Sequence, residues 1–241
     1  MRFRLDIRFN GSAYHGWQKQ AHAPTVQGAL ETALSILFRQ AVETTGCGRT
    51  DTGVHARFFP VHFDCDQALT EPFLYRLNSL LPDDIAVLNC VPVSDDFHAR
   101  FSAKSRTYRY YIRFEKDPFC PEISWFQHRR PDVAKMNQCA ALLTGTHDFR
   151  CFTKGEEPMH HGFECMVSLA RWETIGDLLV FTVEANRFLR NMVRAMVGSL
   201  LAVGYNQKPE DWFRQLLADG VRADAGQSVP AHGLFLEDVG Y

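Results

Sequence analysis

The sequence lacks the features that mark a membrane-spanning, secreted or disulfide-stabilised protein. No uninterrupted apolar run reaches the ~18 residues that a transmembrane helix needs. The first residues alternate polar and apolar side chains, unlike the apolar core of a secretory signal. Seven cysteines are odd in number, scattered, and never spaced as C-x-x-C, which is typical of reduced cytosolic thiols. We therefore expect a cytoplasmic protein without a membrane anchor.

Excess positive charge is also missing. The formal charge is −2 and the isoelectric point about 6.5, which argues against indiscriminate binding to nucleic acids. The charge is nevertheless uneven, because residues 98–130 hold eight Lys and Arg against three acids, whereas residues 210–241 hold six acids against two arginines. A basic face with an acidic back suits a structured RNA. A solvated strand face is the alternative that charge alone leaves open.

Cofactor motifs are absent as well. The glycines of Gly46-x-Gly48-x-x-x-x-Gly53 fit neither G-x-G-x-x-G nor G-x-x-x-x-G-K-[ST]. The pattern that follows them indicates a strand, whereas both phosphate loops lead into helices. We therefore expect no nucleotide cofactor. One group of possible metal ligands consists of Cys151, His160, His161 and Cys165. Its spacing matches no established zinc pattern, so we expect no metal there. Whether the group binds anything else stays open.

The most informative segment is the glycine-punctuated turn around Asp51. This carboxylate stands beside Arg49, and an alternating apolar run begins directly after the turn. A carboxylate at a strand end, in a tight loop and next to a positive charge, is placed as a nucleophile or general base would be. Because Asp and Gly are also common turn formers, spacing alone does not exclude an ordinary surface turn.

The apolar periodicity predicts two successive α+β halves. The first half reads β-α-β-β-α-β, the ferredoxin-like or split-βαβ order. Its helical spacing begins after Thr25, a plausible N-cap. The expected elements are strands at 2–9, 41–47, 54–65 and 84–93, with helices from 25 and at 71–81.

The second half repeats this theme more loosely. Its expected elements are a strand at 105–114, a helix at 132–144, a hairpin of 163–173 with 178–185, helices at 187–203 and 208–219, and a strand at 234–239. We predict a division into residues 1–104 and residues 105–241, each an RRM-like α+β half.

The predicted helix at 187–203 carries a second functional signal. Arg187, Arg190, Asn191 and Arg194 are spaced to share one side of it. No acid lies between Glu184 and Glu210 to balance these arginines. Uncompensated guanidinium groups suit contacts to phosphate or carboxylate, and a solvated helix face is the alternative.

These segments together resemble one family. Gly48–Ala56 is similar to G-R-T-D-A-G-V-H-A, the catalytic motif of the tRNA pseudouridine synthase A family, with Thr52 in place of the usual Ala. Further family motifs are matched in the expected order by Tyr14–Gln20, Thr25–Gly28, Phe97–Ala103, Tyr108–Tyr110, Gly145–Phe149, Asn191–Gly198 and Gly233-Leu234. The blocks span nearly the whole chain, so the resemblance is specific.

The resemblance implies a fold and a reaction. Two ferredoxin-like halves would share a mostly antiparallel central sheet with helices on one face. The chain would isomerise uridine to pseudouridine at positions 38 to 40 of the tRNA anticodon stem-loop, acting as a homodimer. Substrate and product are isomers, so no cofactor is needed. Asp51 would be the catalytic carboxylate, and its role as nucleophile or as base stays open.

The resemblance also assigns neighbouring residues. Arg194 would pair with Asp51, and Tyr108 would stack on uracil and serve in proton transfer, although a cross-strand aromatic is the plainer interpretation of Tyr108. Arg49 would fill the space left by the flipped base or hold a phosphate. Because these residues come from both halves, the site is expected in a cleft between them. Weaker candidates for pocket or RNA contacts are His55 and Gln18, and the expected RNA-binding arginines are Arg100, Arg106, Arg187 and Arg190.

Two other classes of function compete with this interpretation. A non-catalytic RNA-binding module would keep the fold and the basic surface, but it would not need Asp51 together with Arg49, Tyr108 and Arg194. A hydrolase that uses Asp51 as a base would need a second carboxylate or a metal set, for which the sequence offers no convincing partner.

Overall fold

The computed structural model describes residues 1–67, 69, 72–154 and 162–241 of the chain. It is a mixed α/β structure whose described part contains five α-helices and mostly antiparallel strands. The chain forms two compact units, residues 1–104 with 235–241, and residues 105–234. The closing strand, which the sequence analysis placed in the second half, thus groups with the first unit. Within the described residues, no helix is both long and apolar enough to cross a membrane.

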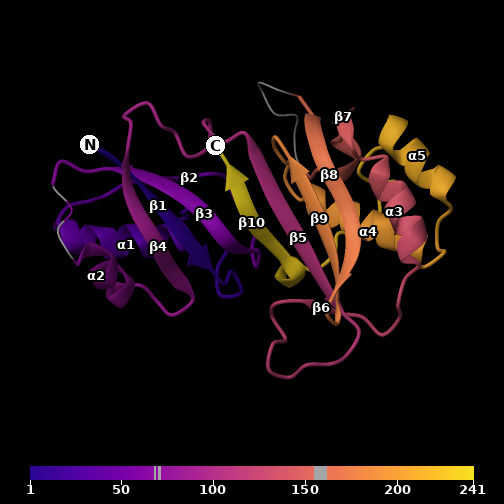
Figure 1. Cartoon of the computed structure of the whole chain (residues 1–241), viewed down its shortest axis with the longest axis horizontal. Coiled ribbons are helices and arrows are strands. Elements are labelled where there is room, and N and C mark those ends of the chain that lie inside the picture. The colour runs from indigo at the N-terminus through magenta and orange to yellow at the C-terminus, as the bar shows by residue number, and fades with distance from the viewer. Residues whose placement is uncertain (68, 70–71, 155–161) are drawn as a thin grey trace. The chain divides into compact units, whose positions relative to one another are not determined.

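The first unit follows the β-α-β-β-α-β order expected from its sequence (Figure 1). Strands β1 and β3 are antiparallel neighbours, β4 lies on the other side of β1, and β2 pairs with one end of β3. The last strand, β10, runs parallel to β3 at its other end. The elements are β1 (Arg2–Phe9), α1 (Val26–Phe38), β2 (Thr44–Gly46), β3 (His55–Asp64), α2 (Phe73–Leu80), β4 (Ile85–Val93) and β10 (Leu234–Gly240).

Helix α1 shows how local sequence sets this unit. The side chain of Thr25 accepts a hydrogen bond from the Gly28 N–H, so the predicted N-cap is confirmed. Leu30 and Leu34 are fully buried and form its core face. The helix ends where Arg39 takes a left-handed conformation with φ of 55°.

The second unit is built on an antiparallel sheet in the order β5-β9-β8-β7, with the short β6 parallel to β5. The β8–β9 hairpin was predicted, and its turn contains Gly176 at a φ of 61°. Helix α3 packs against β8 and contacts α4 and α5 (Figure 1). The elements are β5 (Ser105–Arg113), β6 (Trp125–Phe126), α3 (Val133–Ala141), β7 (Gly145–Asp148), β8 (Glu164–Ile175), β9 (Leu178–Ala185), α4 (Met192–Gly204), α5 (Glu210–Asp219) and two 3₁₀ turns at Arg150–Phe152 and Ala231–Gly233.

The prediction of one helix over residues 187–203 is wrong at its start. Helix α4 begins at Met192, because Asn191 adopts a left-handed φ of 66° that breaks helical geometry. The carbonyl of Arg190 instead accepts hydrogen bonds from the Lys154 N–H and the Thr153 hydroxyl. Arg187 and Arg190 therefore lie in the segment before the helix, and they do not share a helical face with Arg194.

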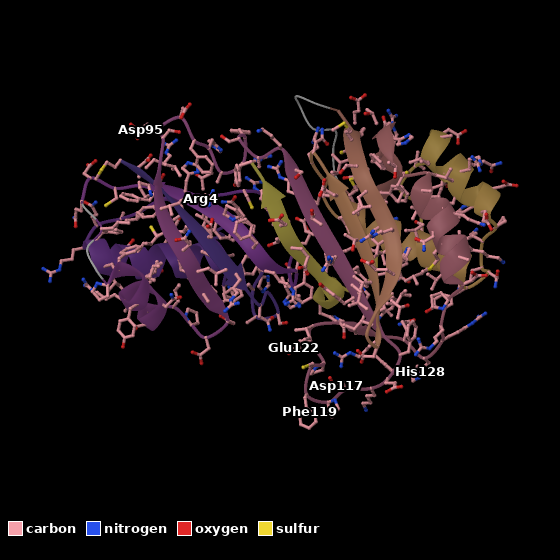
Figure 2. All side chains as sticks on the ribbon, viewed as in Figure 1. Arg4, Asp95, Asp117, Phe119, Glu122 and His128 are labelled. Carbon is pink, nitrogen blue, oxygen red and sulfur yellow. The ribbon has the colours of Figure 1, made fainter. Side chains whose placement is uncertain are left out.

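Residues 114–124 form a loop of the second unit that connects β5 to β6. Figure 2 shows Phe119 at its outer end, with the ring pointing away from the sheet, and 90% of this residue is exposed. The base of the loop is fixed by Arg113, which is buried, pairs with Asp117 at 3.1 Å and hydrogen-bonds Ser124. One arginine of the basic segment thus serves the fold and is withdrawn from the surface.

Candidate functional site

The Asp51 loop rests on a segment from earlier in the chain. The Trp17 N–H donates to the Thr50 carbonyl at 3.3 Å, and the Gly53 N–H donates to the Tyr14 carbonyl at 3.3 Å. Gly16 has a φ of +85°, and a Cβ there would lie 2.3 Å from the Thr50 carbonyl oxygen. The backbone on both sides of Asp51 is therefore held by a close approach that only glycine allows.

Asp51 itself is half-buried at the turn that precedes β3. Its carbonyl accepts the Val54 N–H at 3.1 Å, which closes the turn. Arg49, two residues before it, is exposed. The loop therefore fixes the main chain around a carboxylate while leaving an exposed guanidinium beside it in the sequence.

The glycines of this loop have different roles. A Cβ at Gly46 would fall 2.6 Å from the Phe59 ring and 2.7 Å from the Trp17 ring, so the core fills that space. A Cβ at Gly48 would meet nothing within 4 Å. Gly53 has a φ of 77°, which a side chain rarely tolerates. Of these three, Gly48 has the open surroundings expected where a flat ligand approaches the main chain.

His55 is part of the internal packing of the first unit. It is 1% exposed, its Nδ1 accepts the Gly11 N–H at 3.0 Å, and its ring stacks on Phe235 at 4.4 Å between centroids. A Cβ at Gly11 would lie 2.0 Å from the Val54 carbonyl oxygen. The histidine therefore ties the end of the Asp51 loop to β10, a role that its motif position alone does not distinguish from substrate contact.

Gln18 also has an internal partner. Its side-chain N–H donates to the side-chain Oε1 of Gln27 at 2.8 Å, and Gln27 belongs to the first turn of α1. This contact directs the amide toward the helix.

The segment Phe97–Ala103 forms a tight turn around His98. The Nδ1 of His98 accepts the N–H groups of Arg100 and Phe101 at 3.1 and 3.2 Å. His62 lies beside this turn and accepts the Ala99 N–H at 3.1 Å, and burial lowers its pKa to about 4. Arg100 is exposed and lies over the ring of Phe101, which is 75% exposed. This turn presents a cation and an aromatic ring together.

In the second unit, Tyr108 is half-buried and lies edge-on to Phe188 at 5.1 Å between ring centroids. It pairs in register with Val183 on β9. Arg106 donates to the Asn186 carbonyl at 2.8 Å. Tyr108 is thus more accessible than Tyr110, which is fully buried two residues along the same face of β5.

Arg194 is held in place by the segment that follows Gly226. Its Nε donates to the Val229 carbonyl at 2.7 Å, and its own carbonyl accepts the Val229 N–H at 3.2 Å. The guanidinium lies close enough to Tyr110 and His232 for its charge to affect the pKa of both groups, although burial is the larger cause: it raises the pKa of Tyr110 and lowers that of His232. The orientation of Arg194 is therefore set by contacts within the second unit.

Three glycines make this arrangement possible: Gly198 and Gly233, which end or begin motifs named above, and Gly226, which no motif contains. A Cβ at Gly198 would lie 1.8 Å from the Gln227 carbonyl oxygen, and one at Gly226 would lie 2.7 Å from the Gly198 carbonyl carbon. A Cβ at Gly233 would lie 2.7 Å from the Tyr110 ring, whose hydroxyl donates to the Pro230 carbonyl at 2.9 Å. Their presence in or near the motifs was the available signal, but the contacts that require them depend on the fold.

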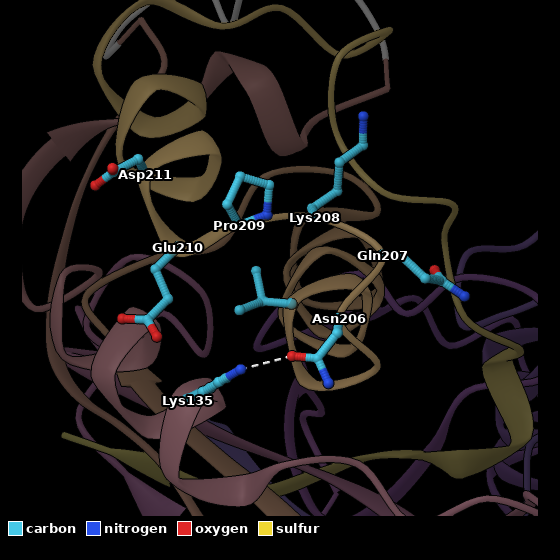
Figure 3. A pocket seen from close by; sticks show the side chains of 8 residues that line it. Lys135, Asn206, Gln207, Lys208, Pro209, Glu210 and Asp211 are labelled. Carbon is cyan, nitrogen blue, oxygen red and sulfur yellow. Dashed lines mark hydrogen bonds between the residues drawn. The ribbon is translucent and has the colours of Figure 1, made fainter.

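Cavity volume does not identify the site. A cavity of about 620 Å³ lies at the junction of α4 and α5, where Lys135 donates to Asn206 at 2.6 Å (Figure 3). It contains none of the predicted site residues. Its lining mixes amines with the carboxylates of Glu210 and Asp211, which gives an anion no consistent environment.

Of the four possible ligands named above, Cys151 and Cys165 lie in the described residues, and both are buried. In the described ranges, no three His, Cys, Asp or Glu side chains gather as metal ligands would. Burial raises the pKa of Cys151 to about 12 and that of Cys165 to about 11, which keeps both thiols protonated. His160 and His161 lie outside the described residues.

Comparison with known proteins gives consistent matches. A family model described as "tRNA pseudouridine synthase" matches residues 139–241. A protein of Parabacteroides distasonis is 45% identical over 242 residues, covering 100% of this chain and 96% of the relative. Those of Porphyromonas gingivalis and Chlorobaculum tepidum are 43% and 40% identical, covering 100% and 99% of this chain and 97% of each relative. All three carry the name tRNA pseudouridine synthase A.

Proposed function

Because the chain belongs to the tRNA pseudouridine synthase A family, we propose that it isomerises uridine in tRNA to pseudouridine, with Asp51 as its catalytic carboxylate. The reaction class rests on the 40–45% identity to these relatives over nearly their whole length. The loop geometry supports the assignment of Asp51, because Tyr14, Gly16 and Trp17 fix the backbone on both sides of this residue. Fixed positioning of a reacting group is a large source of catalytic acceleration.

The reaction breaks the bond between ribose C1′ and uracil N1 and forms a bond between C1′ and uracil C5. The proton on C5 is lost and N1 gains one, so atoms balance without a co-substrate. An ionised Asp51 can contribute in two ways. As a nucleophile it would bond to the sugar carbon while uracil turns. As a base it would remove a ribose proton and so promote loss of uracil.

We propose that both units contribute to one pocket. The first supplies Asp51 and the exposed Arg49, and the second supplies Tyr108 and the oriented Arg194. In that pocket the guanidinium of Arg194 would pair with the carboxylate of Asp51. The half-exposed ring of Tyr108 has a face that could stack on uracil. This arrangement corresponds to two ferredoxin-like halves that share one sheet around a cleft.

The target and the assembly complete the proposal. We propose that the substrate uridines are those at positions 38 to 40 of the anticodon stem-loop, that the enzyme acts as a homodimer, and that it works in the cytoplasm. Arg100, Arg106, Arg187 and Arg190 would contact the tRNA backbone. His55 and Gln18 are better explained as internal supports, since both have partners within the first unit.

The central test is mass-spectrometric detection of pseudouridine in an unmodified tRNA transcript incubated with wild type, with Asp51→Ala and with Asp83→Ala. Asp83 is an exposed aspartate in a turn of the same unit and serves as the matched control. Product from wild type and Asp83→Ala but not from Asp51→Ala supports the proposal. Tight tRNA binding without product from any of the three would instead favour a non-catalytic RNA-binding module.

A second experiment separates the two roles of Asp51. A transcript carrying deuterium at the ribose C2′ of the target uridine is compared with the protiated transcript under single-turnover conditions. A base that removes this proton in the slow step gives a primary isotope effect. Equal rates, together with a covalent adduct that depends on Asp51, would favour the nucleophile.

A further inference from the structure

We propose that Gln18, Lys19, Gln27 and Glu31 form a positioning network that supports Asp51 indirectly, through the segment that its loop contacts. This inference rests on the proposed function, because it concerns how the catalytic loop of that reaction is supported. None of the four side chains needs to touch the substrate. They act through the backbone of residues 16 and 17, against which the loop is seated.

Gln27 is the centre of the network. The Oε1 of its side-chain amide accepts the Gln18 side-chain N–H at 2.8 Å and the Lys19 backbone N–H at 2.9 Å. Its amide donates to Glu31 Oε1 at 3.1 Å and to the Thr44 carbonyl at 2.8 Å. The residue is buried, and both ends of its amide are in use. An amide with four partners has a single orientation that satisfies them.

Glu31 is the second buried member. Its Oε1 also accepts the N–H and the hydroxyl of Thr44 at 3.0 and 3.1 Å. Its Oε2 pairs with the Lys19 ammonium at 2.8 Å. A buried carboxylate is tolerated only when its charge and lone pairs are matched in this way. The network therefore connects α1, β2 and the segment 17–19.

Helix α1 has sources of stability other than these polar groups. The helix has its own cap in Thr25 and a core face that includes Leu30 and Leu34. Gln27 and Glu31 lie four residues apart and are both buried, where apolar residues of similar size would often be at least as stabilising. Satisfied buried polar networks fix a unique geometry, and here the side chains fix residues 18 and 19, which directly follow Trp17.

The fixed segment leads directly to the catalytic loop. The Gln27 N–H donates to the Trp17 carbonyl at 3.1 Å, and the Val26 N–H donates to the Gly16 carbonyl at 3.3 Å. The Trp17 N–H then donates to the carbonyl of Thr50, the residue before Asp51. A displacement of about 1 Å in a reacting group can lower a rate by about 100-fold. Loosening the network is therefore expected to slow chemistry at Asp51.

The test measures single-turnover pseudouridine formation at saturating tRNA, tRNA affinity and melting temperature for five proteins: wild type, Gln18→Ala, Gln27→Ala, Glu31→Gln and Ala29→Gly. Ala29→Gly is the matched control, because it weakens the same helix without touching the network. Gln18→Ala removes one side-chain hydrogen bond to Gln27 and keeps the buried members, so it remains informative should Gln27→Ala fold poorly.

We expect Gln27→Ala to lower the single-turnover rate at least tenfold, with tRNA affinity within twofold of wild type. Gln18→Ala should lower the rate by a smaller factor, as should Glu31→Gln, which keeps an acceptor for Thr44. Ala29→Gly should lower the melting temperature without lowering the rate at a temperature well below melting.

Three outcomes would overturn the inference. Gln27→Ala and Gln18→Ala could retain the wild-type rate. The rate could fall in proportion to melting temperature, Ala29→Gly included, which would leave the network a purely structural role. Affinity rather than rate could fall, which would make these side chains tRNA contacts. An inactive wild type would instead refute the proposed function, so the two failures are distinct.

Discussion

Replacing Gly198 by alanine should release the segment that orients Arg194. A Cβ at position 198 would lie 1.8 Å from the Gln227 carbonyl oxygen, roughly half of a normal van der Waals contact. The obstacle is main chain, so no side-chain rotation relieves it. Either α4 or the segment 226–229 must move.

The magnitude follows from the hydrogen bonds that this close approach permits. Four connect the segment to α4 or to Asn191, the residue before it: Gly226 N–H to Ser199 Oγ, Asn191 to Ser228, Val229 N–H to the Arg194 carbonyl, and Arg194 Nε to the Val229 carbonyl. Each contributes roughly 0.5–1.5 kcal/mol. Alanine in a helix offsets this by roughly 1 kcal/mol relative to glycine. The free energy of unfolding should therefore fall by about 3 kcal/mol.

The assay is thermal unfolding followed by circular dichroism, combined with pseudouridine formation. A loss of about 3 kcal/mol corresponds to a fall of about 6–12 °C in melting temperature for a chain of this size. Activity should also fall, because Arg194 loses its Val229 anchor. Gly48→Ala is the stability control, since a Cβ there meets nothing within 4 Å. A Gly198→Ala protein that melts within about 1 °C of wild type would refute the reasoning.

Three further predictions concern other parts of the chain. Tyr108→Phe should retain tRNA affinity; unchanged activity would leave only stacking for this ring, and full activity in Tyr108→Ala would remove it from the site. Gly46→Ala should destabilise the first unit by at least ~2 kcal/mol, because the Cβ overlaps Trp17 and Phe59; wild-type urea unfolding would contradict this. Burial lowers the pKa of His62 from 6.5 to about 4 in the folded state. As the pH decreases from 6.5 to about 4, the unfolded chain therefore binds a proton that the folded protein does not, and the free energy of unfolding decreases. This decrease should be smaller in His62→Gln, and an identical pH profile would exclude His62 as its cause.

Sequence patterns were sufficient to predict the features that depend on residues close together in the chain. The N-cap at Thr25, the β8–β9 hairpin and the element order of the first unit follow from capping chemistry and alternation. The predicted start of α4 is wrong because the apolar spacing begins before Met192, where the helix starts. The left-handed backbone of Asn191 depends on contacts that periodicity does not contain. The closing strand pairs with β3 through Phe235 and His55, which are 180 positions apart in a chain of 241 residues, a contact that local patterns do not contain.

The sequence by itself determined the family, the reaction class and the identity of the candidate carboxylate, because these depend on which residues stand in which order. Only the tertiary structure decided which motif residues are supports. His55 and Gln18 are directed to partners inside the first unit, and Gly198 admits the backbone of Gln227. Such roles arise from close contacts between distant segments, and a residue's type and spacing carry no information about which segment will lie against it.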